Sequence, residues 1–236
     1  MKKGNLYLIP NVIAEETSDK VICQQVVGVI QKTHFYLVEN VRTARRYISS
    51  LKTGVVIDDL HFEVLDKKTK NEQLSKIMEP LFNGHDIGVI SESGCPGVAD
   101  PGALAVDYAH KNNIKVTPLV GPSSILLALM GSGFSGQKFC FHGYLPIDKK
   151  EAQKAIQQLE LESIKNSQTQ IVIETPYRNH QLFDIFIQAC NPNTKLCVAR
   201  EISGTHEFIK TQTIAQWKDN KPQMHKIPTV FLLYGG

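Results

Sequence analysis

The sequence lacks the features that would place it in a specialised class of protein. Its five cysteines form no CxxC pair, so their spacing predicts neither a zinc site nor a disulfide framework. The first apolar run, Leu6–Ile9, is too short for a signal peptide, and no other segment approaches the roughly 20 apolar residues of a membrane span. We therefore expect a cytoplasmic protein with reduced thiols, without a metal and without membrane contact.

An excess of charge is also missing. The chain has 26 basic and 23 acidic residues, which gives a net charge of +3, whereas dedicated nucleic-acid-binding proteins usually have a strong basic excess. A composition of 42% hydrophobic and 21% charged residues is that of an ordinary folded protein. The charge therefore gives no argument for an RNA substrate, and the composition excludes a largely disordered chain.

Short apolar runs alternate with amphipathic stretches in the first half of the chain. Helices are predicted from Ser18 to Ile30, at Val41–Leu51 and at Leu74–Phe82, because apolar residues recur there with the helical period. The runs predicted as buried strands are Leu6–Ile9, Phe35–Val38, Val55–Ile57, Ile87–Ile90 and Val116–Leu119. Repetition of strand and helix predicts a mainly parallel sheet.

The pattern changes after Gly121-Pro122. The second half is predicted to contain helices at Ser124–Met130, within residues 145–170 and at Tyr177–Cys190, together with strands of mixed direction. These strands are Phe139–Tyr144, Ile171–Ile173, Leu196–Ala199 and Val230–Tyr234. The predicted fold class is α/β, with two α/β domains at residues 1–119 and 120–236.

The most informative segment runs from Ile87 to Gly102 and reads IGVISESGCPGVADPG. It leads from a buried strand into a loop rich in glycine and proline, where missing Cβ atoms let a ligand approach the backbone. Asp100 and Pro101 are a good N-cap and first-turn pair for the next helix. The spacing is neither GxGxxG nor GxxxxGKS, so the dinucleotide and P-loop interpretations fail. The alternative is a loop that only turns the chain.

A second turn of small residues, Gly121–Ser124, follows the next predicted strand. In a parallel sheet this turn would lie beside the first loop, at the edge where open α/β sheets bind ligands. Ser123 and Ser124 are equally suited to capping the helix that follows. The two turns together favour a ligand site over a simple change of direction.

Seven segments in order along the chain resemble the tetrapyrrole-methylase class of S-adenosylmethionine-dependent methyltransferases, and within it the branch that methylates a ribose 2'-hydroxyl of small-subunit ribosomal RNA, at a cytidine. The segments are LYLIP (6–10), VENVRT (38–43), SESGCPGVADPG (91–102), LVGPSS (119–124), FHGYLP (141–146), ETPYR (174–178) and VAREISGTHE (198–207). They extend over nearly the whole chain.

This resemblance implies a homodimer of two-domain subunits that bind S-adenosylmethionine in the interdomain cleft of each subunit, largely against small and apolar residues. The cofactor candidates from the first domain and the junction are Pro10, Gly94, Cys95, Pro96, Val98, Ser123, Ser124 and Ile125. Those from the second domain are Ile173, Ala199, Pro228 and Thr229. No metal is implied.

The candidates for chemistry are charged residues near predicted strand ends. A ribose hydroxyl is a weak nucleophile, so a carboxylate that accepts its proton would help, and Glu39 is the best candidate. Arg42, one turn further, could hold a phosphate or that carboxylate. Arg178 and Arg200 stand beside Glu174 and Glu201 at other strand ends, where the alternative for each pair is a structural ion pair. The resemblance favours a functional role for Glu39, Arg42, Arg178 and Arg200.

The sequence departs from the family pattern at three places. The Gly-Asn pair usual after the first proline is replaced at residues 11–15 by NVIAE, and the usual Asp-Ala-Gly-Thr-Pro reads ESGCP at residues 92–96. Many relatives continue into a small helical extension where this chain ends at Tyr234–Gly236. Because RNA affinity depends on neutralised phosphates, these departures leave the substrate open.

Three functions therefore compete. The first is methylation of ribosomal RNA in the small ribosomal subunit. The second is methylation of a corrin or porphyrin precursor. The sequence counts against this function, because it has Gly94-Cys95-Pro96 where that branch typically has Gly-Asp-Pro. The third is a non-catalytic relative that binds the cofactor or RNA, which the fold alone does not exclude.

Overall fold

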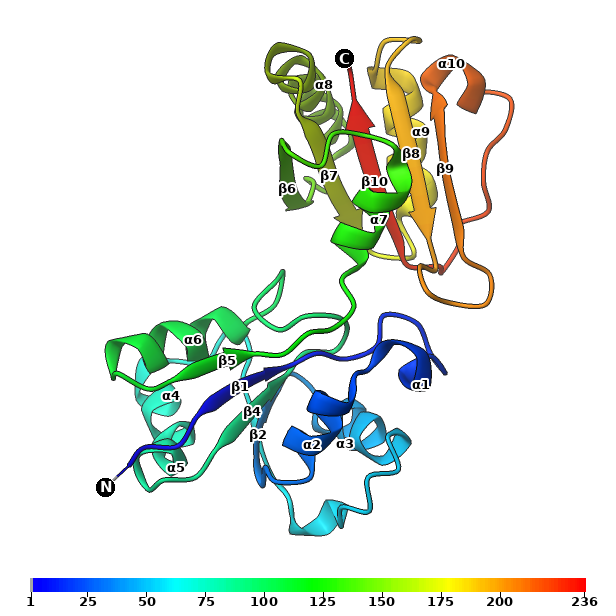
Figure 1. Cartoon of the computed structure of the whole chain (residues 1–236). Coiled ribbons are helices and arrows are strands. Elements are labelled where there is room, and N and C mark those ends of the chain that lie inside the picture. Colours follow the sequence, from blue (N-terminus) through cyan, green and yellow to red (C-terminus); the bar gives the residue numbers. More distant parts are fainter. Residues whose placement is uncertain (1) are drawn as a thin grey trace. The chain divides into compact units, whose positions relative to one another are not determined.

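The computed structural model describes residues 2–236. It divides the chain into two compact units, one ending at Ser123 and the other running from Ser124 to Gly236 (Figure 1). The domain boundary predicted from the sequence, after residue 119, lies shortly before this division. Each unit has its own sheet and its own hydrophobic core.

The N-terminal unit is built on a five-stranded sheet in the order β3-β2-β4-β1-β5. Its strands are β1 (Leu6–Ile9), β2 (Phe35–Val38), β3 (His61–Val64), β4 (Ile87–Ile90) and β5 (Val116–Pro118). Every paired strand runs parallel, as predicted. The strand predicted at Val55–Ile57 is wrong: Ile57 begins a 3₁₀ turn, η1 (Ile57–Asp59), and the real strand comes after it. That strand lies at the sheet edge and is mostly exposed, so it lacks a buried apolar run.

Helices cover both faces of this sheet. They are α1 (Ser18–Val21), α2 (Gln24–Ile30), α3 (Val41–Ser50), α4 (Asn71–Ile77), α5 (Glu79–Phe82) and α6 (Gly102–Lys111). One core cluster packs α2 and α3 on the sheet, and another packs α4, α5 and α6. The helix predicted at Leu74–Phe82 is two helices, because Pro80 lacks the N–H that a continuous helix needs there. The helix predicted from Ser18 is also divided, at extended residues Ile22 and Cys23, and Thr17 holds its N-cap position.

The C-terminal unit has a mixed sheet in the order β6-β7-β10-β8-β9. Its strands are β6 (Phe139–Tyr144), β7 (Thr169–Glu174), β8 (Lys195–Arg200), β9 (Phe208–Thr213) and β10 (Thr229–Tyr234). β6 and β7 are parallel and the other pairs are antiparallel, which confirms the predicted mixed directions. The sequence did not indicate β9, an edge strand of the polar sequence FIKTQT that is only partly buried.

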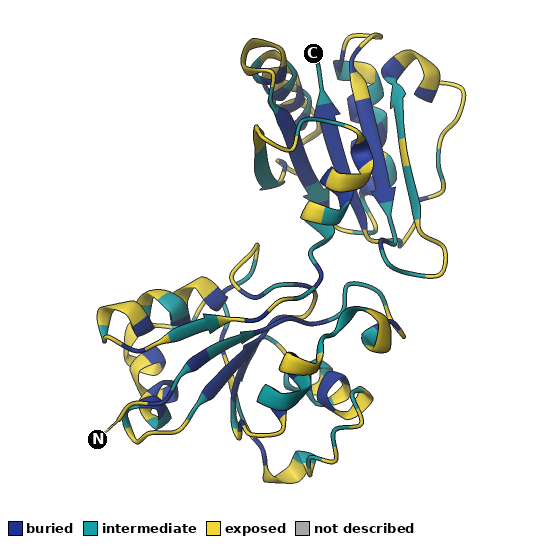
Figure 2. Ribbon diagram, in the orientation of Figure 1, coloured by how far each residue is buried: buried dark blue, intermediate teal, exposed yellow. Residues whose placement is uncertain are grey.

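The helices of the C-terminal unit lie on opposite faces of this sheet. They are α7 (Ser124–Ser132), α8 (Lys149–Asn166), α9 (Asn179–Ala189) and α10 (Ile214–Trp217). Figure 1 shows α7 on one face and α8 and α9 on the other, and Figure 2 shows buried residues concentrated along the central strands. Within residues 2–236 we find no helix that combines the length and apolar character needed to span a bilayer.

Trp217 is a central residue of this core. It is 1% exposed, its ring meets Phe183 edge to face with centroids 5.7 Å apart, and its indole Nε1 donates to the Leu196 carbonyl at 2.8 Å. The indole therefore joins α9, β8 and α10, and its hydrogen bond fixes one orientation of the ring.

We expect Trp217→Phe to lower the free energy of unfolding of the C-terminal unit by about 1–3 kcal/mol, because the buried Leu196 carbonyl would lose its side-chain donor. Urea unfolding followed by circular dichroism measures this change. The exposed neighbour Lys218 supplies the control, since Lys218→Ala should stay within about 0.5 kcal/mol of the wild type. Equal stability of Trp217→Phe and the control would contradict the assigned role.

Candidate active site

The carboxyl ends of the N-terminal strands meet at one edge of the sheet. β1 and β4 are neighbours there, yet β1 connects toward β2 and β4 connects toward β5, which lie on opposite sides of the pair. In open α/β sheets, ligands bind at such a switch point, outside the carboxyl ends of the strands. The loops after β1, β4 and β5 therefore form the first candidate site.

Asn11 holds the loop after β1 to the loop after β4. This residue is 3% exposed, and its Nδ2 donates to the carbonyls of Ser91 and Glu92, both at 3.1 Å. Its backbone N–H donates to the Gly94 carbonyl at 2.9 Å. Both loops are thus fixed by one buried residue, which no pattern in the sequence marked as functional.

The turn after β5 packs on the same loops, as predicted. The Cys95 thiol donates to the Pro122 carbonyl at 3.3 Å, and Tyr47 Oη donates to the Pro10 carbonyl at 2.6 Å. A Cβ atom on Gly121 would lie 2.1 Å from Cβ of Pro10, so only glycine fits at this position. The candidates Pro10, Gly94 and Cys95 therefore lie together in one packed group of loops.

The loop from Gly94 to Gly102 is shaped by left-handed residues and by one carboxylate. Gly94, Gly97 and Ala99 have φ values of 70°, 85° and 64°. Asp100 Oδ1 accepts hydrogen bonds from the backbone N–H groups of Gly97 at 2.6 Å and Gly102 at 2.7 Å. Helix α6 begins at Gly102, one residue later than the predicted first-turn Pro101. Asp100 thus fixes the loop as well as the start of the helix.

Glu39 and Asp100 line the same small cavity at the ends of β2 and β4, together with Ser91. Burial raises the pKa of Glu39, the N–H of Glu92 lowers it, the charges of Asp100 and Glu92 raise it, and Lys67 lowers it. Burial also raises the pKa of Asp100, and hydrogen bonds from Gly97, Gly102 and Ser91 partly offset this effect by lowering it. Glu39 is thus a carboxyl group whose affinity for a proton is increased, as a general base requires.

We expect Asp100→Asn to lower the pKa of Glu39. An asparagine Oδ1 can still accept from both backbone N–H groups, whereas the charge that raises the pKa of Glu39 is removed. The measurement is an NMR titration of the side-chain carboxyl carbon of Glu39, assigned with Glu39→Gln. A midpoint that stays the same or moves up would contradict the coupling of the two groups.

Gly121→Ala should destabilise the N-terminal unit by about 1–3 kcal/mol, because the added methyl group overpacks the contact with Pro10. Thermal unfolding followed by circular dichroism tests this effect. Gly28 in α2 is the matched control, since nothing lies within 4 Å of its Cβ position. Gly28→Ala should be neutral or stabilising by up to about 1 kcal/mol, and equal effects of the two variants would refute the steric argument.

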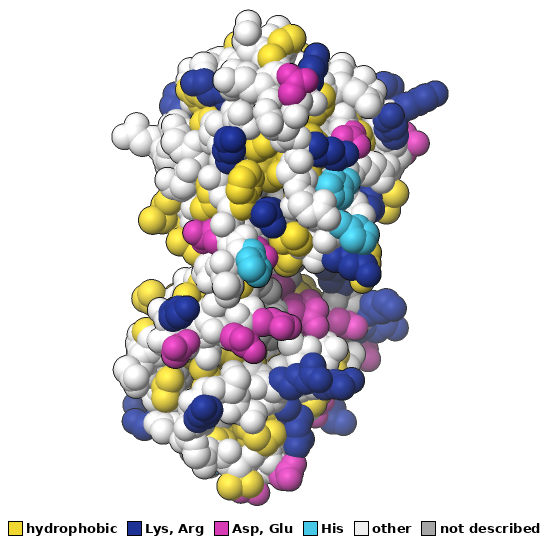
Figure 3. All heavy atoms as spheres, turned by 90° about the vertical axis from the view of Figure 1, so that its right-hand side faces the viewer, with side chains coloured by type: hydrophobic (Ala, Val, Ile, Leu, Met, Phe, Trp, Pro, Cys, Tyr) yellow, Lys and Arg dark blue, Asp and Glu magenta, His cyan; other side chains and the backbone are white. Residues whose placement is uncertain are grey.

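A pocket of about 390 Å³ opens beside these loops. It is lined by residues of the altered NVIAE segment together with Arg46, Tyr47 and Glu92, and its acidic side chains are Glu15, Glu16 and Glu92. The face drawn in Figure 3 shows acidic side chains gathered on the N-terminal unit. The altered segment of the sequence therefore forms part of a pocket wall.

The other candidates near the N-terminal loops have fewer contacts that tie them to Glu39 or to the packed loops. Arg42 is exposed in the first turn of α3, and the cation that lowers the pKa of Glu39 is Lys67. Pro96 is buried, Val98 is 48% exposed and Ser123 is the last residue of the N-terminal unit. Ser124 and Ile125 begin α7 in the C-terminal unit.

Candidates of the C-terminal unit gather at one end of its sheet. Thr229 of β10 stands in register with Glu174 of β7 and Arg200 of β8, and Val230 stands in register with Ile173 and Ala199. Because side chains alternate along a strand, Ile173 and Ala199 share the sheet face of α7, whereas Thr229 and Arg200 share the face of α9. Pro228 precedes this end and its carbonyl accepts from the Glu201 N–H at 2.9 Å.

The two arginines of this end differ in their partners. Arg178 pairs with Glu174 at 3.0 Å, as the sequence suggested. The suggested pair of Arg200 and Glu201 is wrong: Arg200 lies over the Phe208 ring at 5.2 Å, and Glu201 accepts from the His206 N–H at 3.3 Å. β8 ends at Arg200, and Glu201 begins the following turn with a φ of 49°, so the two side chains do not meet. Among the described residues, Nε of Arg178 and Nε of Arg200 are buried without a hydrogen-bond partner, which is uncommon for buried polar atoms.

No group of three or more His, Cys, Asp or Glu side chains in the described part of the chain is arranged to hold a metal ion. The five cysteines are free thiols. Burial raises the pKa of the Cys95 thiol, and the charge of Asp100 adds to this effect, so Cys95 is not an activated nucleophile.

The profile of the Tetrapyrrole (Corrin/Porphyrin) Methylases matches residues 20–218. The chain belongs to this family, which confirms the resemblance seen in the sequence.

Individual relatives agree with this assignment. Ribosomal RNA small subunit methyltransferase I from Buchnera aphidicola subsp. Schizaphis graminum is 27% identical to the chain, covering 100% of it and 79% of the relative. The protein of the same name from Vibrio cholerae is 25% identical, covering 98% and 77%.

Two solved structures share the fold. The methyltransferase CobJ has a TM-score of 0.62 at 16% identity, with 98% of this chain and 94% of CobJ covered. Uroporphyrin III C-methyl transferase from Thermus thermophilus has a TM-score of 0.57 at 13% identity, with 98% and 97% covered. These likenesses confirm the predicted α/β fold class.

Proposed function

We propose that the protein is an S-adenosylmethionine-dependent methyltransferase that methylates a ribose 2'-hydroxyl of small-subunit ribosomal RNA. The observation that carries the reaction is the position of Glu39, a partly buried carboxyl group of raised pKa beside the packed loops after β1, β4 and β5. Support for the substrate comes from relatives named as ribosomal RNA small subunit methyltransferases, which match the chain over almost its full length.

The residues of the N-terminal loops suit a cofactor with an adenosine and a thioether. A Cβ atom on Gly97 would approach no atom more closely than the Ala103 nitrogen at 4.0 Å, so there is open space beside this backbone. The candidates Pro10, Gly94, Cys95, Pro96 and Val98 are small or apolar, and such residues bind a ligand mainly by shape. When bound, S-adenosylmethionine would supply an activated methyl group.

The candidate contacts in the C-terminal half are Ser124, Ile125, Ile173, Ala199, Pro228 and Thr229, with Ser123 at the end of the N-terminal unit. For the chemistry, Glu39 accepts the proton of the ribose hydroxyl as the hydroxyl attacks. Arg42, Arg178 and Arg200 are candidates for holding RNA phosphates through their guanidinium groups. Homodimer formation and a location in the cytoplasm are part of the same proposal.

The test of the substrate uses methyl-labelled S-adenosylmethionine and small ribosomal subunits from a strain that lacks this gene. Label on a ribose 2'-hydroxyl, located by nuclease digestion, is the expected result. Cofactor binding without any labelled RNA would refute the ribosomal substrate. A tetrapyrrole precursor is then the next acceptor to be assayed, and a protein inert toward both acceptors would be a non-catalytic relative.

Glu39→Gln should lower kcat by about a hundred- to ten-thousand-fold, the usual contribution of a general base, while binding of S-adenosylhomocysteine is unchanged. The wild-type rate should rise with pH through the raised pKa of Glu39 and then level off, because only the carboxylate accepts the proton. The variant should lack this limb of the pH profile. A variant that keeps both the rate and the limb would exclude Glu39 as the base.

A further inference from the structure

The segment Lys221–Thr229, which we call the strap, leads from α10 into β10 and ends at two cofactor candidates, Pro228 and Thr229. It is attached to the first turn of α9 by Asn179, which is 0% exposed. Asn179 Nδ2 donates to the Ile227 carbonyl at 2.6 Å and to Thr229 Oγ1 at 3.2 Å. Thr229 Oγ1 in turn donates to the Ile227 carbonyl at 2.9 Å. One carboxamide thus fixes the residues on both sides of Pro228.

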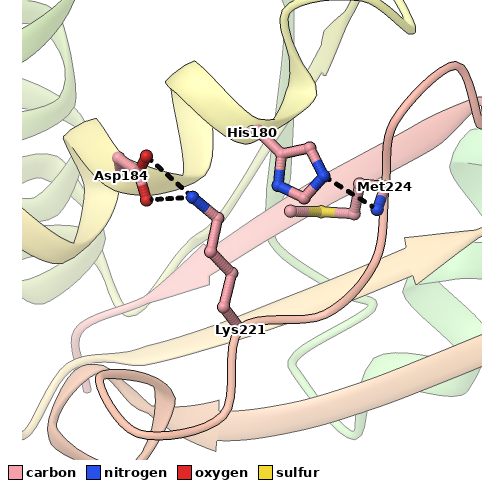
Figure 4. Close-up of polar contacts among 4 residues, drawn as sticks. All are labelled: His180, Asp184, Lys221 and Met224. Carbon is pink, nitrogen blue, oxygen red and sulfur yellow. Dashed lines mark hydrogen bonds and ion pairs between the residues drawn. The ribbon is translucent and has the colours of Figure 1, made fainter.

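Two further residues of α9, His180 and Asp184, hold the middle and the beginning of the strap. Figure 4 shows His180 and Asp184 facing Met224 and Lys221. His180 Nε2 accepts a hydrogen bond from the Met224 N–H at 3.3 Å, and Lys221 Nζ pairs with Asp184 Oδ1 at 2.7 Å. The Met224 side chain is buried in the core of the unit. The strap is therefore attached to α9 at several points along its length.

The attachment matters because the strap leads directly into candidate cofactor contacts. Thr229 begins β10 between Glu174 and Arg200, and the Pro228 carbonyl accepts from the Glu201 N–H. The candidates at this end of the sheet thus share one backbone path with Ile227, whose carbonyl Asn179 holds. A shift of Ile227 would move Pro228 and Thr229, whereas Asn179 itself need not touch a ligand.

We propose that Asn179 is a positioning residue for cofactor binding, which clamps the strap so that Pro228 and Thr229 are held in place, and that His180 makes this clamp sensitive to pH. The inference rests on the proposed function, because it takes Pro228 and Thr229 as cofactor contacts. The role of Asn179 is derived from its hydrogen bonds to both sides of Pro228.

The pH sensitivity arises from the direction of the hydrogen bond. Nε2 of His180 accepts a hydrogen bond from the Met224 N–H, so Nε2 must be unprotonated. Burial lowers the pKa of His180, the charges of Lys221 and His225 lower it further, and Asp184 raises it. Because the folded pKa is depressed, the contact is fully present above the ordinary pKa of histidine and weakens as the pH falls below it. Acidification should therefore loosen the strap.

The experiment compares Asn179→Leu, which keeps the number and branching of the side-chain heavy atoms but removes the donor, with Gln181→Ala on the exposed side of α9. Hydrogen exchange of the strap, read by mass spectrometry, should become about tenfold faster in Asn179→Leu and stay unchanged in the control. Calorimetry should show about tenfold weaker binding of S-adenosylhomocysteine, and the KM for S-adenosylmethionine should rise while kcat is kept.

His180→Gln provides a second and milder test, since glutamine can accept the Met224 N–H without titrating. Wild-type affinity for S-adenosylhomocysteine should fall several-fold between pH 7.5 and pH 5.5, and His180→Gln should remove most of this fall. This comparison decides the role of His180 independently of Asn179→Leu.

The outcomes separate the two proposals. Wild-type exchange rates and affinity in Asn179→Leu would overturn the positioning role of Asn179. An unchanged pH dependence in His180→Gln would overturn the pH sensitivity of the clamp. The proposed function stands in both cases. Failure of the wild-type protein to bind S-adenosylhomocysteine would overturn the proposed function itself, and the cofactor role of Asn179 with it.

Discussion

The site of the N-terminal unit depends on the buried carboxamide of Asn11. The connections after β1 and β4 run in opposite directions, so nothing in the path of the chain keeps these two loops together. Hydrogen bonds from Asn11 to Ser91, Glu92 and Gly94 join them at the point where they diverge. The buried Ser91 carbonyl would lose this donor without Asn11, which is costly in a packed protein. Asn11 thereby holds together two loops that lead to strands on opposite sides of the sheet.

The sequence predicted the sheets far better than their edges. Strands such as β4, with four buried apolar residues, have an unmistakable pattern. β3 and β9 pair on one side only and remain partly exposed, so polar residues are tolerated and the apolar signal disappears. The division of α4 from α5 could have been read from Pro80, because a proline inside a helix removes a backbone donor.

The candidate site was predicted only in part, because only some of its residues leave a local signal in the sequence. Glycines such as Gly94 and Gly121 stand out because their local backbone or their close packing permits no side chain, and this requirement is visible in the sequence. Asn11 and Asn179 act through groups that are distant in the sequence, so their partners appear only once the chain is folded. Arg200 illustrates the converse case. Its neighbour in sequence suggested an ion pair, but strand geometry placed it on the Phe208 ring.

Trp217 is the only tryptophan in the chain, and it is buried in the core of the C-terminal unit against Phe183. Intrinsic tryptophan fluorescence is therefore a local signal, which reports on the surroundings of one sheet and carries no information about the other half. A fluorescence melting curve would describe only half of the molecule, and its midpoint could differ from that of a calorimetric trace without any error in either. Such a difference would show directly whether the two units unfold as one cooperative block or independently.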